Sequence, residues 1–304
     1  MDIAAGIVLY NPNIDRLKQL LAIITRMVDK VFLYNNSSDS FDFILESYKD
    51  KLVYLSEGKN LGIAYALNKI MEKAQMYNYD WVITLDQDTL IPETLVDSFR
   101  PFLKEKDVAI VCPQVIDKRR EYMQVESTEN EVSEINFCIT SASCTNVQVW
   151  KKLGGFDEWL FIDFVDDDFC KRAILSGFRI LRVNRVVIDQ EFGVIEPKSP
   201  KTVKFWIWLS KVTKVRNIAK LSYRKKVSPM RVYYVHRNLL YLNKKFKEYG
   251  GIGYHNFNCS SFISFLFFFS LPSVVLAQEK WHVLKAVIKG LSDGRKASVN
   301  AFNN

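Results

Sequence analysis

A chain of 304 residues, 48% hydrophobic and 25% charged, has the composition of a globular protein and the length for one large α/β domain with an appendage. The first ten residues lack a basic start and form an apolar run, so we expect a buried strand there and no signal peptide. The 5 cysteines form no CxxC pair and no zinc spacing, which predicts reduced thiols in the cytosol.

The formal net charge of +8 is distributed unevenly along the chain. Residues 1–194 carry 22 Lys and Arg against 30 Asp and Glu, whereas residues 195–304 carry 20 against 4. This asymmetry predicts an acidic part that meets a metal and a basic part that meets an anionic partner. Because no zinc-finger or RNA-recognition signature is present, we expect a membrane surface or a diphosphate-bearing acceptor rather than nucleic acid.

Hydrophobic periodicity in the first 90 residues predicts alternating strands and helices. The expected strands are 3–10, 30–34, 52–56 and 81–85, and the expected helices are 14–28 and a helix through 74. This alternation favours a parallel sheet. The loop 57–64 opens the second helix, so its backbone N–H groups would face an anion.

Two acidic clusters lie about 80 residues apart. Asp86 and Asp88 end the apolar strand 81–85, at the sheet edge where α/β proteins bind ligands. One or two carboxylates plus substrate phosphates commonly hold Mg2+. The second cluster, 163–168, offers a base for chemistry near that phosphate. Together they predict metal-assisted transfer from a nucleotide-activated donor.

Six ordered segments carry a resemblance to a known family. They are Tyr10-Asn11-Pro12, Asn35-Asn36-Ser37-Ser38, Asn60-Leu61-Gly62-Ile63-Ala64, Leu85-Asp86-Gln87-Asp88-Thr89, Gly154-Gly155-Phe156-Asp157-Glu158 and Phe161-Ile162-Asp163-Phe164-Val165-Asp166. Over residues 3–195 the chain resembles the family 2 glycosyltransferases of the GT-A fold, especially bacterial rhamnosyltransferases of O-antigen and capsule synthesis. The resemblance implies a Rossmann-like, mostly parallel sheet flanked by helices, with Mg2+ or Mn2+ as cofactor.

The resemblance also implies which residues bind the donor. They are Tyr10, Asn35, Asn60, Gly62, Asp86, Gln87 and Asp88. Asp88 would contact the metal that bridges the diphosphate, with Asp86 near the ribose or the metal, and an Asp-Gln-Asp triplet resembles the rhamnosyltransferases. Asn35 stands where relatives often have an Asp that reads the pyrimidine base. A tight turn at Asn35 and a helix cap at Asn60 and Gly62 are the structural alternatives.

In the second cluster, Asp166 falls where inverting relatives place their general base, with Asp163 or Asp168 as alternatives. Asp163 is also expected on the acceptor side. Aspartates at 166–168 would in any case favour a helix N-terminus. Gly154-Gly155 would end a helix over 149–153. Gln190 stands where many relatives have His, so either a neighbouring carboxylate, at 189 or 191, substitutes or the metal is held more weakly.

We expect a catalytic domain over 1–195 and a basic helical region over 196–304 that serves the acceptor, the membrane or oligomerisation. Arg237 is the candidate for an acceptor or donor phosphate, with a packed helix face as the alternative. The uncharged run 256–278 approaches the length of a bilayer span, and 280–291 has the pattern of a basic amphipathic helix. Peripheral attachment to the inner face of the cell membrane is favoured over a span, and packing on the catalytic domain or on a second copy is the alternative.

Three functions are considered. The leading one is an inverting transfer of L-rhamnose from dTDP-rhamnose to a polysaccharide or polyprenyl-diphosphate-linked acceptor in bacterial surface-glycan synthesis. A same-fold enzyme using UDP-galactose, UDP-glucose or another nucleotide sugar is the second. A non-catalytic, membrane-bound glycan-assembly subunit is the third, and retention of Asp86, Asp88 and Asp166 disfavours it.

Overall fold

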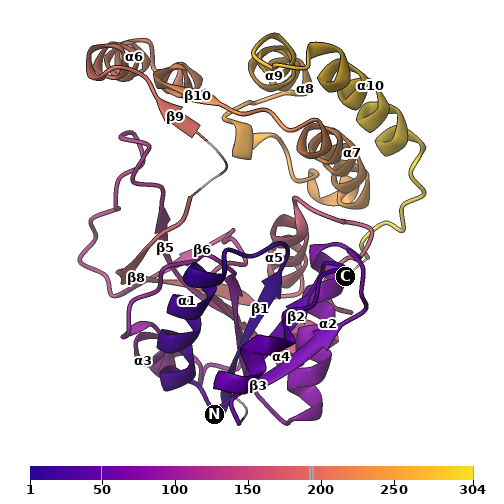
Figure 1. Ribbon diagram of the computed structural model, residues 1–304. Helices are drawn as coiled ribbons and strands as arrows, with labels where there is room; N and C mark the ends of the chain where they lie inside the picture. Colours follow the sequence, from indigo (N-terminus) through magenta and orange to yellow (C-terminus); the bar gives the residue numbers. More distant parts are fainter. Residues whose placement is uncertain (49, 192, 194, 304) are drawn as a thin grey trace. The chain divides into compact units, whose positions relative to one another are not determined.

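The computed structural model describes residues 1–48, 50–191, 193 and 195–303 (Figure 1). The chain folds into two compact units, which are described separately. Unit 1 comprises 1–116 and 125–190, and unit 2 comprises 117–124 and 191–303. The domain boundary expected from the sequence, between 195 and 196, lies a few residues after unit 2 resumes at 191. Residues 117–124 were not expected in the second unit.

Unit 1 is built on one eight-stranded sheet with the order β3-β2-β1-β4-β7-β5-β8-β6. Its strands are β1 (Ile3–Leu9), β2 (Val31–Asn35), β3 (Leu52–Ser56), β4 (Trp81–Asp86), β5 (Val108–Ile116), β6 (Val132–Ile135), β7 (Ser143–Asn146) and β8 (Arg179–Asp189). The first four strands are parallel, β5 is parallel to β8, and β7 and β6 are antiparallel to their neighbours. The predicted mostly parallel sheet is confirmed.

The register of the parallel strands aligns their carboxyl ends. Leu9 pairs with Asn35, and Asn35 pairs with Ser56. On the other side of β1, Val8 pairs with Asp86. The segments that follow β1, β2, β3 and β4 therefore leave the sheet at one edge, which is where α/β folds place ligands.

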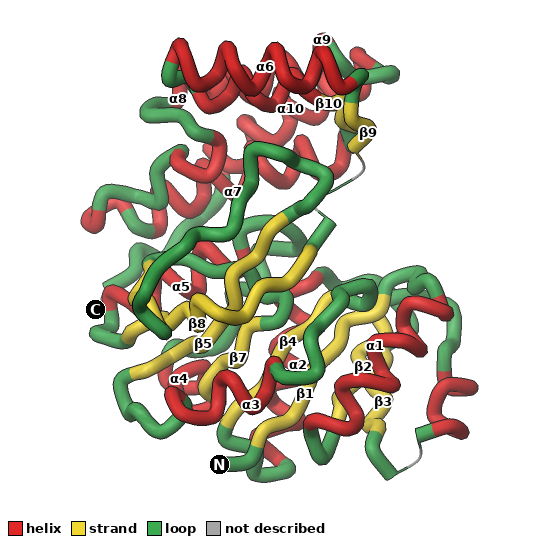
Figure 2. Tube along the Cα trace, turned by 90° about the vertical axis from the view of Figure 1, so that its left-hand side faces the viewer, coloured by secondary structure: helices red, strands yellow, loops and turns green. Residues whose placement is uncertain are grey.

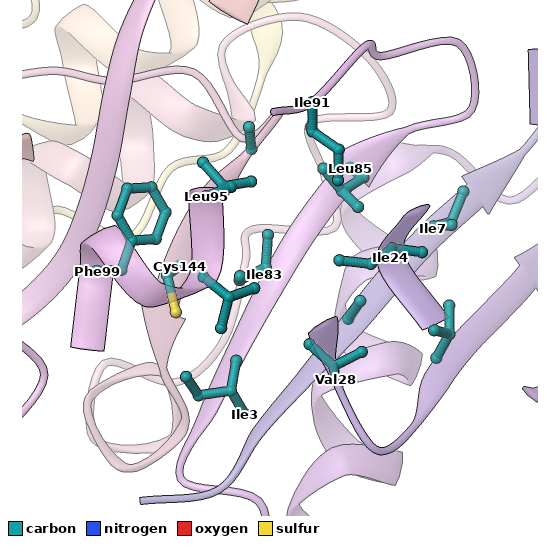
Figure 3. Close-up of a cluster of buried hydrophobic side chains, with 14 of the residues drawn as sticks. Ile3, Ile7, Ile24, Val28, Ile83, Leu85, Ile91, Leu95, Phe99 and Cys144 are labelled. Atoms are coloured by element: carbon teal, nitrogen blue, oxygen red, sulfur yellow. The ribbon is translucent and has the colours of Figure 1, made fainter. Parts of the chain in front are cut away.

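Helices cover both faces of this sheet (Figures 1 and 2). The helices of unit 1 are α1 (Ile14–Met27), α2 (Ile63–Met76), α3 (Leu95–Phe99), α4 (Val147–Lys152) and α5 (Val165–Leu175), with 3-10 turns η1 (Asp42–Ser47) and η2 (Arg100–Phe102). Side chains of α1 and α3 pack with the strands in one large core, which Figure 3 shows around Ile7, Ile24, Ile83 and Phe99. On the opposite face, α2 lies so close to β1 that a Cβ at Gly6 would meet Ile70.

The expected elements agree with these bounds to within two residues. α1 begins where predicted because the Asn13 side chain accepts hydrogen bonds from the backbone N–H groups of Asp15 and Arg16. α4 ends at the expected glycines, since Gly154 and Gly155 have φ of +78° and +81° and bond back to the last helical carbonyls.

Unit 2 is mainly helical. Its elements are β9 (Ile195–Pro197), α6 (Pro200–Thr213), η3 (Arg216–Ser222), β10 (Tyr223–Lys225), α7 (Pro229–Lys245), η4 (Lys247–Tyr249), η5 (His255–Phe257), α8 (Phe262–Phe265), the π-helical turn η6 (Leu266–Ser270), α9 (Leu271–Val275) and α10 (Lys280–Lys296). The segment 117–124 is bound to the rest of the unit through the Arg120 guanidinium and the Tyr122 hydroxyl, which both contact the Tyr223 hydroxyl. The stretch 255–275 has the length and composition of a bilayer span.

Candidate active site

The first acidic cluster follows β4 at the carboxyl edge of the sheet. Gln87 bridges this strand end to the end of β1, because its side chain accepts a hydrogen bond from the Tyr10 backbone N–H at 2.7 Å and donates to the Tyr10 carbonyl at 3.0 Å. Asp88 is exposed and Asp86 partly exposed. The Gln87 amide thus locks the two strand ends together and leaves the flanking carboxylates at the surface.

Gln190 occupies the position beside Asp86. Its amide Nε2 donates to Asp86 Oδ2 at 3.3 Å, and its Oε1 accepts from the hydroxyls of Thr89 at 3.0 Å and Ser141 at 3.3 Å. Ser141 also accepts from the Asp86 backbone N–H at 3.4 Å. Because Thr89, Ser141 and Gln190 are all buried, these bonds fix the Gln190 amide with its N–H group toward the carboxylate.

The turn after β2 uses the Asn35 side chain. Asn35 is 1% exposed, its Oδ1 accepts from the Ser37 hydroxyl at 2.6 Å, and its Nδ2 donates to the Asp39 carbonyl. The structural alternative, a tight turn, is therefore present, and recognition of a base by Asn35 stays a prediction.

Asn36, which the sequence reasoning did not single out, holds the next loop. Its side chain donates to the Gly62 carbonyl and accepts from the Leu61 N–H at 2.8 Å. In the same loop, the Asn60 side chain accepts from the Gly62 N–H at 3.0 Å. Gly62 has φ of +92°, and a Cβ there would lie 2.7 Å from the Phe161 carbonyl oxygen. Only glycine allows this approach, which brings the loop after β3 against the second acidic cluster.

That second cluster begins with an unusual backbone. Asp163 and Phe164 are consecutive residues with φ of +66° and +68°, although neither is glycine. The Ile63 N–H donates to the Phe161 carbonyl at 2.8 Å and anchors the segment just before them. A bulky residue such as Phe164 rarely adopts this conformation, and backbone strain of this kind concentrates at functional sites.

Asp166 lies in the first turn of α5. Burial raises its pKa to about 6, against backbone hydrogen bonds that lower it, and the negative charge of Asp163 raises it further. One of its oxygens accepts the Asp167 backbone N–H at 3.1 Å. A carboxylate with this pKa is ionised at neutral pH and still basic enough to take a proton.

Asp168 has a different environment. It is 0% exposed and forms an ion pair with Arg172, one turn further along α5, at 2.6 Å. Arg172 also donates to the carbonyls of Leu153 at 2.7 Å and Gly155 at 2.8 Å, where α4 ends. This pair joins the two helices and gives Asp168 a structural position, whereas Asp163, Asp166 and Asp167 are partly exposed.

Sequence reasoning missed Asn68, a buried residue in the middle of α2. Its Nδ2 donates to the Phe156 carbonyl and to Glu158, and its Oδ1 accepts from the Trp150 indole and the Phe156 N–H. A Cβ at Gly155 would lie 2.9 Å from that Oδ1. An Asn at a core-facing position of an amphipathic helix was the available signal, since a buried amide requires partners.

Arg237 lies on α7 of unit 2, so it is not placed relative to the carboxylates of unit 1. Its guanidinium stacks over the Tyr234 ring at 4.7 Å and donates to Asn238 at 2.9 Å. The tyrosines next to the arginine thus support its side chain, and a phosphate-binding role stays a prediction.

The donor set of the first cluster suits a hard cation. Within the described parts of the chain, no three His, Cys, Asp or Glu side chains are clustered to hold a metal by themselves. Asp86 and Asp88, two residues apart at one strand end, offer carboxylate oxygens only. Such a pair fits Mg2+ or Mn2+ bound through one or two carboxylates together with substrate phosphates.

Comparison with known proteins identifies the class to which this fold and site belong. The family described as glycosyl transferase family 2 matches residues 6–163, more than half of the chain, and the chain belongs to that family. The dTDP-rhamnosyl transferase RfbF of Shigella flexneri is 26% identical over 204 residues. That match covers 59% of this chain and 65% of the relative, which is less than two thirds of its length.

Solved structures share the fold at low sequence identity. A mannosyltransferase from Pyrobaculum calidifontis, in complex with GDP-Man and Mn2+, has a TM-score of 0.52 at 14% identity, over 97% of this chain and 75% of its own. TarS of S. aureus, residues 1–349 with UDP, has a TM-score of 0.50 at 13% identity, over 97% and 89%. GalNAc-T7 with UDP, GalNAc and Mn2+ reaches 0.55 at 12% identity, over 90% and 57%. The expected GT-A fold is confirmed.

Proposed function

We propose that this glycosyltransferase transfers L-rhamnose from dTDP-rhamnose, with inversion, to a lipid-linked or polysaccharide acceptor in bacterial surface-glycan synthesis. The similarity to a dTDP-rhamnosyl transferase supports this donor. The Asp-Gln-Asp triplet 86–88 supports it as well. The same proposal places the chain on the cytoplasmic face of the cell membrane.

The observation that carries the inverting mechanism is the environment of Asp166. In our proposal this carboxylate removes the proton from the acceptor hydroxyl as that oxygen attacks the anomeric carbon opposite the leaving diphosphate. Its pKa of about 6 leaves it ionised at neutral pH. Asp163, which stands beside it, keeps that pKa raised and lies on the acceptor side.

The residues around the first cluster bind and orient the donor. Asp88 and Asp86 would hold Mg2+ or Mn2+, which would supply positive charge against the departing diphosphate. The Gln190 amide orients Asp86, and Gln87 holds the end of β1 at Tyr10 beside the carboxylates. The Ile63 N–H is bonded to the Phe161 carbonyl, so the N–H groups of the first turn of α2 that follow it face the donor phosphates in our proposal.

A donor screen tests the proposal. Release of nucleoside diphosphate is measured with dTDP-rhamnose, UDP-glucose, UDP-galactose, UDP-GlcNAc and GDP-mannose, each with Mn2+ and with EDTA. Metal-dependent release with dTDP-rhamnose alone is expected, and NMR of the product should show the anomeric configuration inverted. Turnover with a UDP sugar and not with dTDP-rhamnose would show that the proposed donor is wrong. Unchanged turnover in EDTA would show that the reaction does not need the metal.

A further inference from the structure

Helix α6 of unit 2 exposes a row of large apolar side chains. Phe205, Trp208 and Val212 are 50%, 57% and 59% exposed, and their spacing puts them on one helix face. Val203, the buried residue of α6, lies on the opposite face. Isolated apolar side chains are ordinary on a protein surface, but an aligned face of them marks an interaction site.

A second row runs along α8, η6 and α9. Ile263, Phe267, Leu271 and Val275 recur every four residues, and each is more than half exposed. The other side of this helical run packs on α7: Phe265 is buried, and the Ser270 hydroxyl lies 2.7 Å from His236 Nε2. One side of the run therefore contacts protein, and the other is left to solvent.

The dimensions favour a helix that lies on a bilayer rather than one that crosses it. The helical part of the stretch, from Phe262 to Val275, is about 21 Å long at about 1.5 Å per residue. The hydrocarbon core of a bilayer is about 30 Å thick. A shorter helix with one packed face and one apolar face is typical of an interfacial element.

The positive charge around α6 favours an anionic lipid surface over a second copy of this chain as the partner of its apolar face. Exposed basic residues flank its apolar face, and no acidic residue occurs between 200 and 216; the basic residues are Lys201, Lys204, Lys211, Lys214 and Arg216. A second copy of this chain would bring the same positive charges together, which opposes association. An anionic lipid surface neutralises them, which favours binding of this face to such a membrane.

We propose that α6 is a bilayer-interface helix which, together with the row 263–275, holds the enzyme on a membrane that contains anionic lipid. α6 and α9 lie along the same edge of unit 2 in both views (Figures 1 and 2). Trp208 would lie at headgroup level, where Trp is enriched. The inference rests on the proposed function, in which the acceptor is lipid-linked, and it adds the element that contacts the lipid.

Vesicle sedimentation of the full chain tests the proposal. The parent should sediment with phosphatidylcholine vesicles that contain phosphatidylglycerol, and about tenfold more weakly after Phe205→Ser combined with Trp208→Ser, because the apolar area that enters the bilayer is lost. Phe43→Ser combined with Met76→Ser, which alters exposed apolar residues of unit 1, should bind as the parent does. Lys204→Gln combined with Lys211→Gln should reduce binding to the anionic vesicles only.

Two further measurements complete the test. Vesicles with brominated acyl chains should quench the emission of Trp208, a component that Trp208→Phe removes. Equal vesicle binding by the parent and the α6 double variant, or no binding by the parent, would overturn the proposal. So would a dimer in analytical ultracentrifugation that the double variant dissociates. Turnover with a water-soluble acceptor should be equal in both, which separates this proposal from the proposed function.

Discussion

The two acidic clusters of unit 1 contain the same residue type in two different environments. At the end of β4, neutral amides set the geometry: Gln87 bonds to the backbone of Tyr10, and Gln190 donates to Asp86. At the start of α5, the Arg172 guanidinium forms a buried ion pair with the Asp168 carboxylate, so that carboxylate is paired within the protein. Burial and the negative charge of Asp163 raise the pKa of Asp166 to about 6.

In our proposal this difference separates donor binding from proton transfer. The exposed Asp88 and the partly exposed Asp86, which accepts a 3.3 Å hydrogen bond from the Gln190 amide, suit a cation and a diphosphate. A partly buried carboxylate next to another negative charge holds its proton more strongly and suits a base. The proposed role of each aspartate depends on its neighbours, so substitutions of those neighbours should change stability, donor affinity and turnover in different ways.

The largest effect is expected from removing the cation of the buried pair. Arg172→Ala leaves the Asp168 charge buried without its guanidinium and should lower the free energy of unfolding by about 3–5 kcal/mol. Urea denaturation measures it. The control is Lys69→Ala, which breaks the more exposed Lys69–Glu72 pair on α2 and should cost less than about 1 kcal/mol. Equal losses would mean that the α5 pair has no special structural role.

Asp88→Ala should weaken donor binding at least about tenfold, or about 1.4 kcal/mol, because the metal loses a ligand and the diphosphate its bridge. Calorimetry with dTDP-rhamnose and Mn2+ measures the affinity, and EDTA should abolish the difference between variant and parent. Glu93→Ala, an exposed carboxylate after the same strand, serves as the control. An unchanged donor affinity in Asp88→Ala would mean that Asp88 is not a ligand of the metal.

Gln190→Ala tests whether the amide orients Asp86. The affinity for donor with Mn2+ should fall about tenfold or less. Losing a residue that orients a metal ligand typically lowers metal affinity or activity by about 10–100-fold. The lower end of that range is expected here because the 3.3 Å hydrogen bond is long. Donor affinity without metal should stay the same. If both affinities fall together, Gln190 supports the fold of the loop rather than the carboxylate.

Asp163→Asn should have the smallest effect, a shift in pH dependence. The Asp163 charge raises the pKa of Asp166, so its removal lowers that pKa and keeps the base ionised at lower pH. The acidic limb of the turnover profile, near pH 6 in the parent, should move down by less than about one pH unit. Asn also tolerates the left-handed backbone at this position. A limb that stays in place would mean that another group titrates.

The sheet and both clusters could be predicted from the sequence, because periodicity and short motifs are local signals. The hydrogen bonds that orient side chains within the clusters could not be predicted, since they join residues that are distant in the sequence. Tyr10 and Gln87 are 77 residues apart, and Asp86 and Gln190 are 104 apart. The pairing of Asp168 with Arg172 is the exception, because an i,i+4 spacing on a helix would have indicated it.

Two other features could not be predicted from local sequence signals: the boundary between the two units, and the exposed apolar face of α6. Residues 117–124 form a polar turn without periodicity, and contacts such as those of Tyr122 with Tyr223 and of Arg119 with Glu191 join them to unit 2. The exposed face of α6 was missed because a run of large apolar residues, 205–208, is as compatible with a buried core helix as with an exposed one. Exposure, which only the folded chain gives, distinguishes the two.

The central claim is that Asp166 acts as the base and is separable from donor binding. Asp166→Asn keeps the shape and the hydrogen-bonding capacity of the side chain but cannot accept the proton. The measurement is single-turnover transfer to the acceptor, with donor titration on the same protein. We predict a rate about 10²–10⁴-fold below the parent, with donor affinity changed less than about threefold. A rate within a few fold of the parent, with Asp163→Asn inactive instead, would contradict the account.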